Sequence, residues 1–389
     1  MTEFFDVVVI GGGAVGASVG YFLRAQDPTV SVAVVDRDPT FEFASTPRAS
    51  GGVRRLFSLP ENIALSQFSI DFFRRFPTDM AVEGTGPDIG FHTDGYLFIV
   101  PPAEVDMLRD NFDIQTSLGC RVEWLEPDAL AQRYPSMQVA DLGAAVFSPD
   151  DGWLDPHSVL MATRATAKRL GCTFIGDEVV GFDRTPAAVT GVRLGSGRAL
   201  RAEAVVNAAG AWADQICHML GERVPITPLR RYEHYFECQD PIEPLPYLKD
   251  TQRLAFRPEG RGYSGGVPTV DEPRGVDFRV NGGYFDNVVW PALAHRFPQF
   301  ERTRCLRTLA GLYDQNDFDG NVIIGPGLGG LGNFHLLAGF SGHGLMHAPG
   351  CGRAMAELLL TGGYRTIDLT RLGWQRVASG TPLPERGII

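Results

Sequence analysis

The chain has 389 residues and a formal net charge of −11 at neutral pH, with a pI near 5.2. An acidic protein of this size has no general attraction for nucleic acid or an anionic membrane surface, so we expect neither as a partner. The length predicts two domains, and 44% hydrophobic with 21% charged residues is typical of a globular protein that needs no disulfide staples.

The chain begins with a predicted strand at 7–10, a glycine turn and a helix at 14–26, followed by a second strand at 30–35 that ends on Asp36. The turn matches G-x-G-x-x-G through Gly11, Gly13 and Gly16. Such glycines let a pyrophosphate approach a helix N-terminus, and an acid about 20 residues later holds a ribose hydroxyl. The stretch therefore predicts a dinucleotide site; the alternative is a glycine loop between packed elements.

A small, polar, glycine-rich loop occupies 44–52, where its backbone donors can lie against a ligand. Arg54 follows, and a helix is expected at 61–76 after Pro60. From about residue 91 short strands and helices alternate, which predicts a second domain inserted into the first.

Later segments return to the first domain. The stretch 204–212 reads as a buried strand ending in a glycine turn, 224–320 is rich in predicted strands, and a strand at 333–337 leads into a glycine-rich stretch and a helix at 350–360. We expect one domain from residues 1–90, 140–220 and 321–389, and another from residues 91–139 and 221–320.

The late glycine-rich stretch, 338–349, opens a helix and contains His343. A helix N-terminus with free N–H groups stabilises the negative charge of a reduced flavin. A nucleotide domain interrupted by inserted segments is also typical of glutathione-reductase-like flavoproteins. The alternative is an ordinary strand–turn–helix joint.

The six cysteines are scattered without a C-x-x-C pair, and the eight histidines lack metal-binding spacings, so we expect reduced thiols and no metal site. The chain shows no targeting segment and no apolar run of 18 residues, which predicts no transmembrane segment and a cytoplasmic protein.

These motifs together resemble the D-amino-acid-oxidase-like FAD-dependent oxidoreductases, the superfamily that includes sarcosine oxidase, dimethylglycine dehydrogenase and D-arginine dehydrogenase. The resemblance spans nearly the whole chain, through 11–16 with Asp36, 44–48, 207–212, 256–260 and 339–344. It implies an α/β (α+β) fold: a glutathione-reductase-like FAD-binding Rossmann domain with an inserted mixed β-sheet substrate domain.

Four further segments, 57–63, 310–314, 318–319 and 388–389, resemble a mitochondrial branch of this family that is linked to assembly of a respiratory complex. The chain shows no mitochondrial presequence, so we interpret it as a bacterial-type relative.

Three positions depart from the sarcosine oxidase pattern. The covalent flavin cysteine falls on Gly311, which we expect in a turn, and this implies FAD bound without a covalent link. The lysine that activates oxygen falls on or near Ser264, which favours a dehydrogenase over an oxidase. The lysine that pairs with the substrate carboxylate falls on Met346.

The carboxylate must then be bound elsewhere, and Arg54 is the first candidate. The other candidates for the reaction are His343, Tyr313 and Arg257, each of which has a structural role as its alternative. The residues expected to hold the cofactor are Gly11, Gly13, Ala14, Val15, Gly16, Asp36, Arg37, Ser45, Thr46, Arg48, Ala49, Ser50, Gly51, Gly52, Val179, Ala208, Ala209, Gly210, Trp212, Gly311, Gly339, Gly342, His343, Gly344 and Leu345.

The resemblance implies oxidation of the C–N bond of a secondary amine or N-substituted amino acid by hydride transfer to flavin N5, giving an imine that hydrolyses. No clear catalytic base is visible in the sequence. Two alternatives stay open: a flavin-containing assembly factor for a respiratory complex, and one subunit of a heteromeric dehydrogenase. The electron acceptor (oxygen, quinone or a partner protein) and the oligomeric state are also open.

Overall fold

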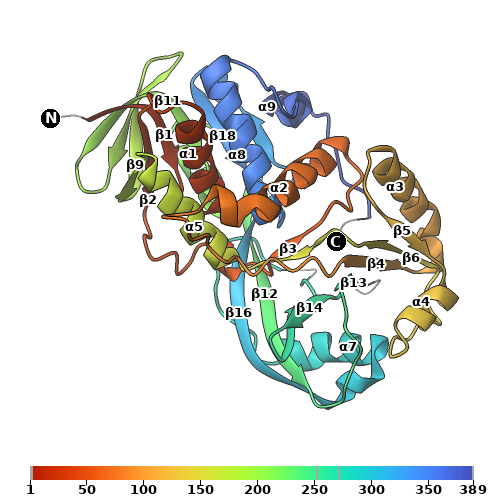
Figure 1. Ribbon diagram of the computed structural model, residues 1–389. Coiled ribbons are helices and arrows are strands. Elements are labelled where there is room, and N and C mark those ends of the chain that lie inside the picture. Colours follow the sequence, from red (N-terminus) through yellow and green to blue (C-terminus); the bar gives the residue numbers. More distant parts are fainter. Residues whose placement is uncertain (1–2, 251–252, 270–271, 388–389) are drawn as a thin grey trace.

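The computed structural model describes residues 3–250, 253–269 and 272–387. A largely parallel sheet, with strands from both ends of the chain, forms the centre of one of its two parts (Figure 1). Its main strand order is β17-β18-β11-β1-β2-β8, parallel along this path except for β17 at one edge; β10 (Val189–Leu194) joins the sheet by antiparallel pairing with β11, and β9 (Val179–Arg184) pairs antiparallel with β10. The bounds are β1 (Glu3–Ile10), β2 (Val32–Asp36), β8 (Thr173–Gly176), β11 (Ala199–Asn207), β17 (Ile323–Gly325) and β18 (Phe334–Ala338). Residues 388–389, which belong to the resemblance described above, lie outside the described residues.

Both faces of this sheet are covered, which is why its strands are almost continuously apolar. Along β1, Val7 and Val9 face the core beneath four helices, whereas Val8 and Ile10 face a second core on the other side. The four helices are α1 (Ala14–Gln26), α2 (Pro60–Asp79), α5 (Pro156–Arg169) and α8 (Gly344–Thr361). The other face holds α6 (Ala213–His218), α9 (Trp374–Ala378) and the strands β9 and β10.

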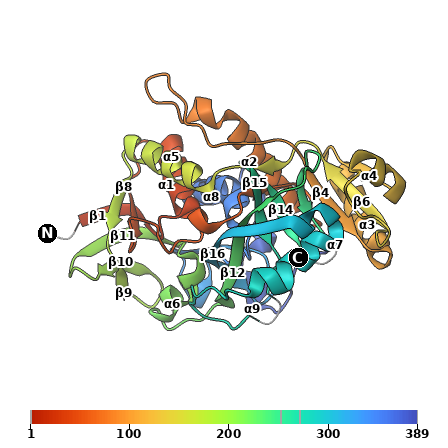
Figure 2. The ribbon, with the colours of Figure 1, turned by 90° about the horizontal axis from the view of Figure 1, so that it is seen from below.

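The second sheet has the order β16-β12-β15-β14-β13-β4-β6-β5 and is antiparallel except between β13 and β4 (Figure 2). Its strands are β4 (Tyr96–Val100), β5 (Glu123–Leu125), β6 (Ala144–Ser148), β12 (Ile226–Cys238), β13 (Tyr247–Lys249), β14 (Ala255–Glu259), β15 (Gly262–Gly266) and β16 (Thr303–Asn316). The remaining elements are α3 (Val105–Ser117), α4 (Pro127–Arg133), α7 (Trp290–Arg296) and the two-stranded pair β3 (Gly52–Val53) and β7 (Gly152–Trp153).

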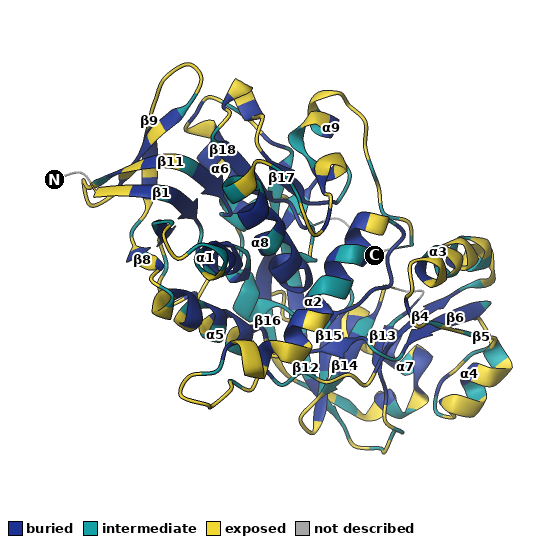
Figure 3. Ribbon diagram, turned by 45° about the horizontal axis from the view of Figure 1, so that its top comes forward, coloured by how far each residue is buried: buried dark blue, intermediate teal, exposed yellow. Residues whose placement is uncertain are grey.

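This architecture confirms the expected fold, an α/β (α+β) nucleotide-binding half joined to a mixed sheet. Figure 3 shows the central strands and α8 buried, whereas α3 and α4 expose one side at the edge of the second sheet. The chain crosses between the sheets several times, and β6, at 144–148, belongs to the second sheet.

Two sequence-based details were wrong. Gly311, expected in a turn, lies within β16 opposite Arg231 of β12, where an added Cβ would lie a tight 3.1 Å from the Cβ of Arg48. The last long helix begins at Gly344 and runs through Pro349, whereas the sequence predicted a start at residue 350. Burial of residues 345–352 against neighbouring helices offsets the hydrogen bond that proline cannot make.

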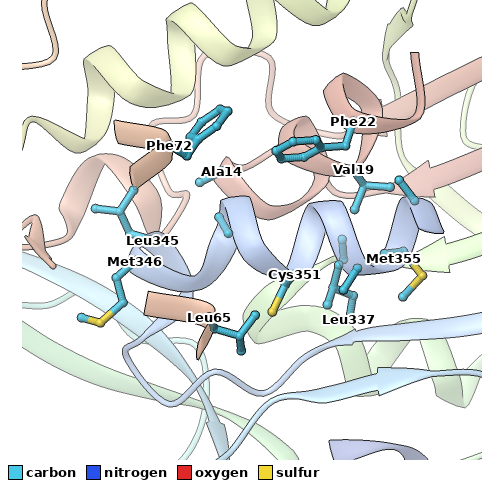
Figure 4. Close-up of a cluster of buried hydrophobic side chains, with 14 of the residues drawn as sticks. Ala14, Val19, Phe22, Leu65, Phe72, Leu337, Leu345, Met346, Cys351 and Met355 are labelled. Carbon is cyan, nitrogen blue, oxygen red and sulfur yellow. The ribbon is translucent and has the colours of Figure 1, made fainter. Parts of the chain in front are cut away.

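Helices α1 and α8, which come from opposite ends of the chain, pack closely against each other over one face of the parallel sheet. Side chains of α1, α2 and α8 interlock in Figure 4, with Cys351 of α8 near Leu65 of α2. At Gly352 of α8 an added Cβ would lie 2.6 Å from the Cβ of Ser18 of α1. The two backbones can therefore approach only because position 352 has no side chain.

We expect Gly352→Ala to lower the free energy of unfolding by about 1–3 kcal/mol, measured by urea titration with circular dichroism, because the added methyl group overpacks the helix contact. Helix propensity alone predicts the opposite sign, a gain of about 1 kcal/mol. Gly363→Ala is the control, since its Cβ would meet nothing within 4 Å. A Gly352→Ala protein as stable as the parent would contradict this account.

Candidate active site

Two cavities meet where the parallel sheet faces the second sheet. The first contains about 1490 Å³ of empty space and the second about 1600 Å³. Residues that line both are Arg48, Ala49, Arg231, Tyr313, Gly342 and Leu345. This junction is where a ligand in the first cavity would meet a ligand in the second.

The glycine turn after β1 forms one end of the first cavity. Gly11 has φ +99°, and an added Cβ would lie 2.4 Å from the Ala208 carbonyl oxygen. A Cβ on Gly16 would lie 1.9 Å from the Gly11 carbonyl oxygen. Asp36 accepts a hydrogen bond from the Gly12 N–H at 2.6 Å, and burial raises the pKa of its carboxyl group. The turn is therefore fixed by backbone contacts that tolerate no side chain.

The N-terminus of α1 is left open toward the cavity. It has no side-chain cap and no acidic residue in its first turn, so its N–H groups and positive dipole end favour an anion. The Ala14 N–H donates to Thr46 Oγ1 at 3.2 Å, which fixes the loop at 45–49 beside it. Ser45 Oγ donates to the Leu312 carbonyl at 2.6 Å and joins that loop to β16.

On another side of the first cavity, Arg37 and Trp212 form a cation–π pair. The Arg37 guanidinium lies 4.2 Å from the ring centroid of Trp212, and Arg37 Nη1 is 3.8 Å from Glu178 Oε1. Val179 is buried and lines the same end.

Most of the predicted cofactor residues line this first cavity, namely Gly11, Gly13, Ala14, Val15, Asp36, Arg37, Ser45, Thr46, Arg48, Ala49, Val179, Ala208, Ala209, Gly210, Trp212, Gly311, Gly342, Gly344 and Leu345. Those that line the second cavity instead are Ser50, Gly51, Gly52 and His343. Gly16 and Gly339 line neither cavity; a Cβ at Gly16 would lie 1.9 Å from the Gly11 carbonyl oxygen, and a Cβ at Gly339 would lie 3.2 Å from side-chain carbons of Asn316 and Ile226.

The turn before α8 is held by a buried carboxyl group. Asp314 of β16 accepts hydrogen bonds from the Gly339 N–H at 2.7 Å and the Phe340 N–H at 3.1 Å. Burial raises the pKa of Asp314 to about 6 despite these bonds. Gly342, with φ +98°, packs so closely on the Tyr313 ring that a Cβ would lie 2.5 Å from it. The open N-terminus of α8 is thereby directed at the junction.

Arg54 is the dominant charge of the second cavity. Its side chain is 1% exposed, and its Nη2 lies 3.1 Å from His343 Nε2. The guanidinium stacks 4.1 Å from the centroid of Phe57. Burial and Arg54 together hold the pKa of His343 well below its ordinary value, so the imidazole is neutral and accepts from Arg54. Within the described ranges Arg54 has no ion pair with a carboxylate.

A second cation and two tyrosines line the same cavity. Tyr96 and Tyr247 stack with ring centroids 4.3 Å apart. Lys249 Nζ and the Arg54 guanidinium lie 5.7 and 5.1 Å from the centroid of Phe98. Burial and the nearby Arg54 charge lower the pKa of Lys249 well below its usual value. The Arg54 guanidinium makes this part of the cavity suited to an anionic group.

An acid lies on the opposite strand of the cavity. Ser264 Oγ donates to Glu233 Oε1 at 2.6 Å, and burial raises the pKa of Glu233 to about 7. Arg231, two residues earlier on β12, stacks 5.3 Å from the centroid of Tyr313. Tyr313 itself lines both cavities.

Arg257, predicted to take part in the reaction, lines neither cavity. Its Nε donates to the Ser50 carbonyl at 2.7 Å, and it pairs with Glu259, so it supports the loop that carries Ser50.

Sequence reasoning missed Glu233, Lys249, Tyr96 and Tyr247. An available signal for Glu233 was the alternation along β12, which sets positions 231 and 233 on one face.

Two expected absences concern metals and membranes. Among the residues that the structure describes, no group of three or more His, Cys, Asp or Glu side chains could hold a metal ion. Over the same residues, no helix has both the length and the apolar character needed to cross a bilayer.

The family profile described as "FAD dependent oxidoreductase" matches residues 6–358. The chain is 33% identical to "FAD-dependent oxidoreductase domain-containing protein 1" of Xenopus laevis over 100% of this chain and 85% of the relative. It is 26% identical to glycine oxidase of Geobacillus kaustophilus, over 92% and 94% of the two chains. The crystal structure of L-proline dehydrogenase from P. horikoshii superposes with a TM-score of 0.86 and 26% identity, covering 98% and 100% of the chains.

We expect Gly13→Val to leave the fold intact but to weaken FAD binding by more than about tenfold, or about 1.4 kcal/mol. An added Cβ at Gly13 meets only Thr46 Oγ1, at an ordinary 3.4 Å, so the protein accommodates it while the side chain obstructs the pyrophosphate position. FAD titration followed by protein fluorescence measures the affinity, and the apoprotein's urea midpoint reports the fold. Gly332→Val, where a Cβ meets nothing within 4 Å, is the control. Unchanged FAD affinity in Gly13→Val would refute this placement.

Proposed function

The chain belongs to the family of FAD-dependent oxidoreductases, and from this premise we propose that it oxidises the carbon–nitrogen bond of a secondary amine or N-substituted amino acid. The observation that carries the proposal is the buried Arg54 guanidinium beside the cavity, which makes no direct ion pair with a carboxylate of the described residues.

The residues of the first cavity fit FAD. A Cβ at Gly11 would clash with the Ala208 carbonyl, and the open N-terminus of α1 suits a pyrophosphate beside the carboxyl group of Asp36. When bound, FAD supplies the acceptor for a hydride from the carbon next to the amine. No cysteine of the chain lines either cavity, so we propose that FAD is held without a covalent link to cysteine.

Arg54 is suited to bind a substrate carboxylate. Burying a guanidinium without a neighbouring anion is costly, and an arriving carboxylate removes that cost while accepting two parallel hydrogen bonds. The neutral His343 and the Phe57 ring hold the guanidinium in position beside the cavity. An amino acid anchored in this way would present its α-carbon toward the junction at Tyr313 and Gly342.

The relatives support an amino-acid substrate. Glycine oxidase and L-proline dehydrogenase are named for amino acids, and proline is itself a secondary amine with an α-carboxylate. The stacked Tyr96 and Tyr247 rings close one wall of the cavity, which excludes water from the reacting carbon.

We favour a dehydrogenase over an oxidase. Ser264, on or near which the oxygen-activating lysine of sarcosine oxidases is expected to fall, carries no charge and donates a hydrogen bond to the carboxyl group of Glu233. A cation stabilises developing superoxide, whereas an acid at this place does not. The electron acceptor would then be a quinone or a partner protein.

We expect Arg54→Met to slow anaerobic flavin reduction by the best amino-acid substrate by roughly 100-fold, because truncating one partner of a buried charge pair costs about 2–5 kcal/mol. The matched control is the amine made by removing that substrate's carboxyl group, whose rate should stay the same in both proteins. Stopped-flow absorbance measures both. Equal losses for the two compounds would show that Arg54 supports only the fold.

Reduced enzyme should transfer its electrons slowly to air and quickly to a quinone or dye acceptor. Stopped-flow mixing of the amine-reduced protein with each acceptor measures the two rates. Fast reoxidation by air would contradict the dehydrogenase assignment. A protein that none of a panel of amines and amino acids reduces would instead favour the assembly-factor alternative.

A further inference from the structure

Carboxyl groups of three described residues line the second cavity, those of Glu233, Asp319 and Glu385. Asp319 is neutralised by Arg376, whose Nε lies 2.8 Å from Asp319 Oδ2. Glu385 accepts hydrogen bonds from the N–H groups of Ser58 at 2.7 Å and Leu59 at 3.0 Å, and so caps the start of α2. These two acids are therefore committed to the fold.

Glu233 differs from them. Its Oε1 accepts the hydrogen bond from Ser264, but its Oε2 has no hydrogen bond to any described residue, and no ion pair to it occurs there. The groups that face it come from every neighbouring strand: Ser264 from β15, Tyr247 from β13 and Tyr313 from β16, with Arg257 and Glu259 of β14 farther along. One carboxylate oxygen thus remains available to a ligand.

The cavity is arranged for a zwitterion. The basic side chains of Arg54 and Lys249 and the acid Glu233 line the same cavity, with Tyr96 and Tyr247 stacked in its wall. A carboxylate bound at Arg54 leaves an ammonium group whose counter-charge is Glu233. The Arg54 guanidinium also disfavours a charged amine, which assists its deprotonation.

We propose that Glu233 accepts the proton that the substrate ammonium group loses before the neighbouring carbon–hydrogen bond is broken. The inference rests on the proposed function, amine oxidation. The N–H bond breaks and leaves its electron pair on nitrogen, while an O–H bond forms on Glu233 Oε2. An ion pair becomes two neutral groups, and the nitrogen lone pair is then available as hydride leaves the carbon.

The histidine and tyrosine side chains at or beside the cavity are poorer proton acceptors. His343 Nε2 is occupied by Arg54, and burial and Arg54 hold the pKa of His343 far below neutrality. His347 is bonded to Ser66, and its pKa is lowered to about 3. Burial raises the pKa of Tyr247 to about 12, so its hydroxyl is not a base at neutral pH. Glu233, at about 7, changes protonation in the working range.

The test compares Glu233→Gln with the parent holoenzyme in anaerobic flavin reduction from pH 5.5 to 10. Because the carboxylate form must be present to take the proton, the parent's second-order rate constant should rise with pH through about 7. In Glu233→Gln this rise should vanish, leaving dependence on the amine's own pKa, with a loss of about 100-fold at pH 7. An unchanged pH profile would overturn the proposal.

A binding measurement gives a readout independent of turnover. The probes are 2-aminoisobutyrate, which has no α-hydrogen to lose, and pivalate, which has a methyl group in place of the ammonium group. The parent should bind the amino acid more tightly than pivalate by calorimetry, and Glu233→Gln should lose that preference. Equal preference in both proteins would contradict the assignment.

Glu237→Gln is the matched control, because Glu237 lies on the same face of β12 but lines neither cavity. It should keep the parent's profile and preference. If Glu233→Gln loses FAD or folds poorly, Glu233→Asp replaces it as the test variant. An increase of the rate constant with pH that is kept but shifted in Glu233→Asp supports the proposal. Loss of that increase in a Glu233→Asp protein that still binds FAD contradicts it. Failure of the parent itself to be reduced by any amine would refute the proposed function, while the two binding probes still test the role of Glu233.

Discussion

The close approach of three backbone segments at Gly11 is the constraint on which the site depends. The end of β1, the end of β11 and the first turn of α1 converge where a single Cβ would clash at 2.4 Å or less, at Gly11 and Gly16. This convergence leaves the helix N-terminus uncovered and directs it into the first cavity. The Asp36 carboxyl group then holds the turn through the Gly12 N–H, at the end of the cavity where we propose that FAD binds.

In the second cavity, Arg54 and Glu233 are charged side chains that make no ion pair with any described residue. Arg54 is buried with aromatic rings and a neutral imidazole as neighbours. Of the acids that line the same cavity, Asp319 is paired with Arg376 and Glu385 accepts hydrogen bonds at the start of α2. One carboxylate oxygen of Glu233 accepts no hydrogen bond from the residues that the structure describes. Buried groups of opposite charge that do not touch each other are costly in a folded protein, and a zwitterionic ligand placed between them relieves both costs at once.

Much of the first cavity could be predicted from the sequence, because the glycine spacing and Asp36 are local signals with a direct structural meaning. The second cavity could not, because its walls come from strands distant in the chain. Glu233 and Ser264 meet only through the pairing of β12 with β15, and Lys249 reaches the cavity through the parallel pairing of β13 with β4. The strand position of Gly311 could not be predicted for the same reason. Its pairing with Arg231 and its close approach to Arg48 involve segments that are distant in the chain.

The order of strands in the first sheet has a consequence for biosynthesis. β1 ends at residue 10, but its neighbour β11 begins at residue 199, and β18, the next strand on that side, begins at residue 334. In a chain emerging from the ribosome, the edge of β1 that pairs with β11 therefore stays unpaired until about half of the chain has been translated. Such nonlocal pairing is slow, and an unpaired strand edge favours aggregation until the sheet closes.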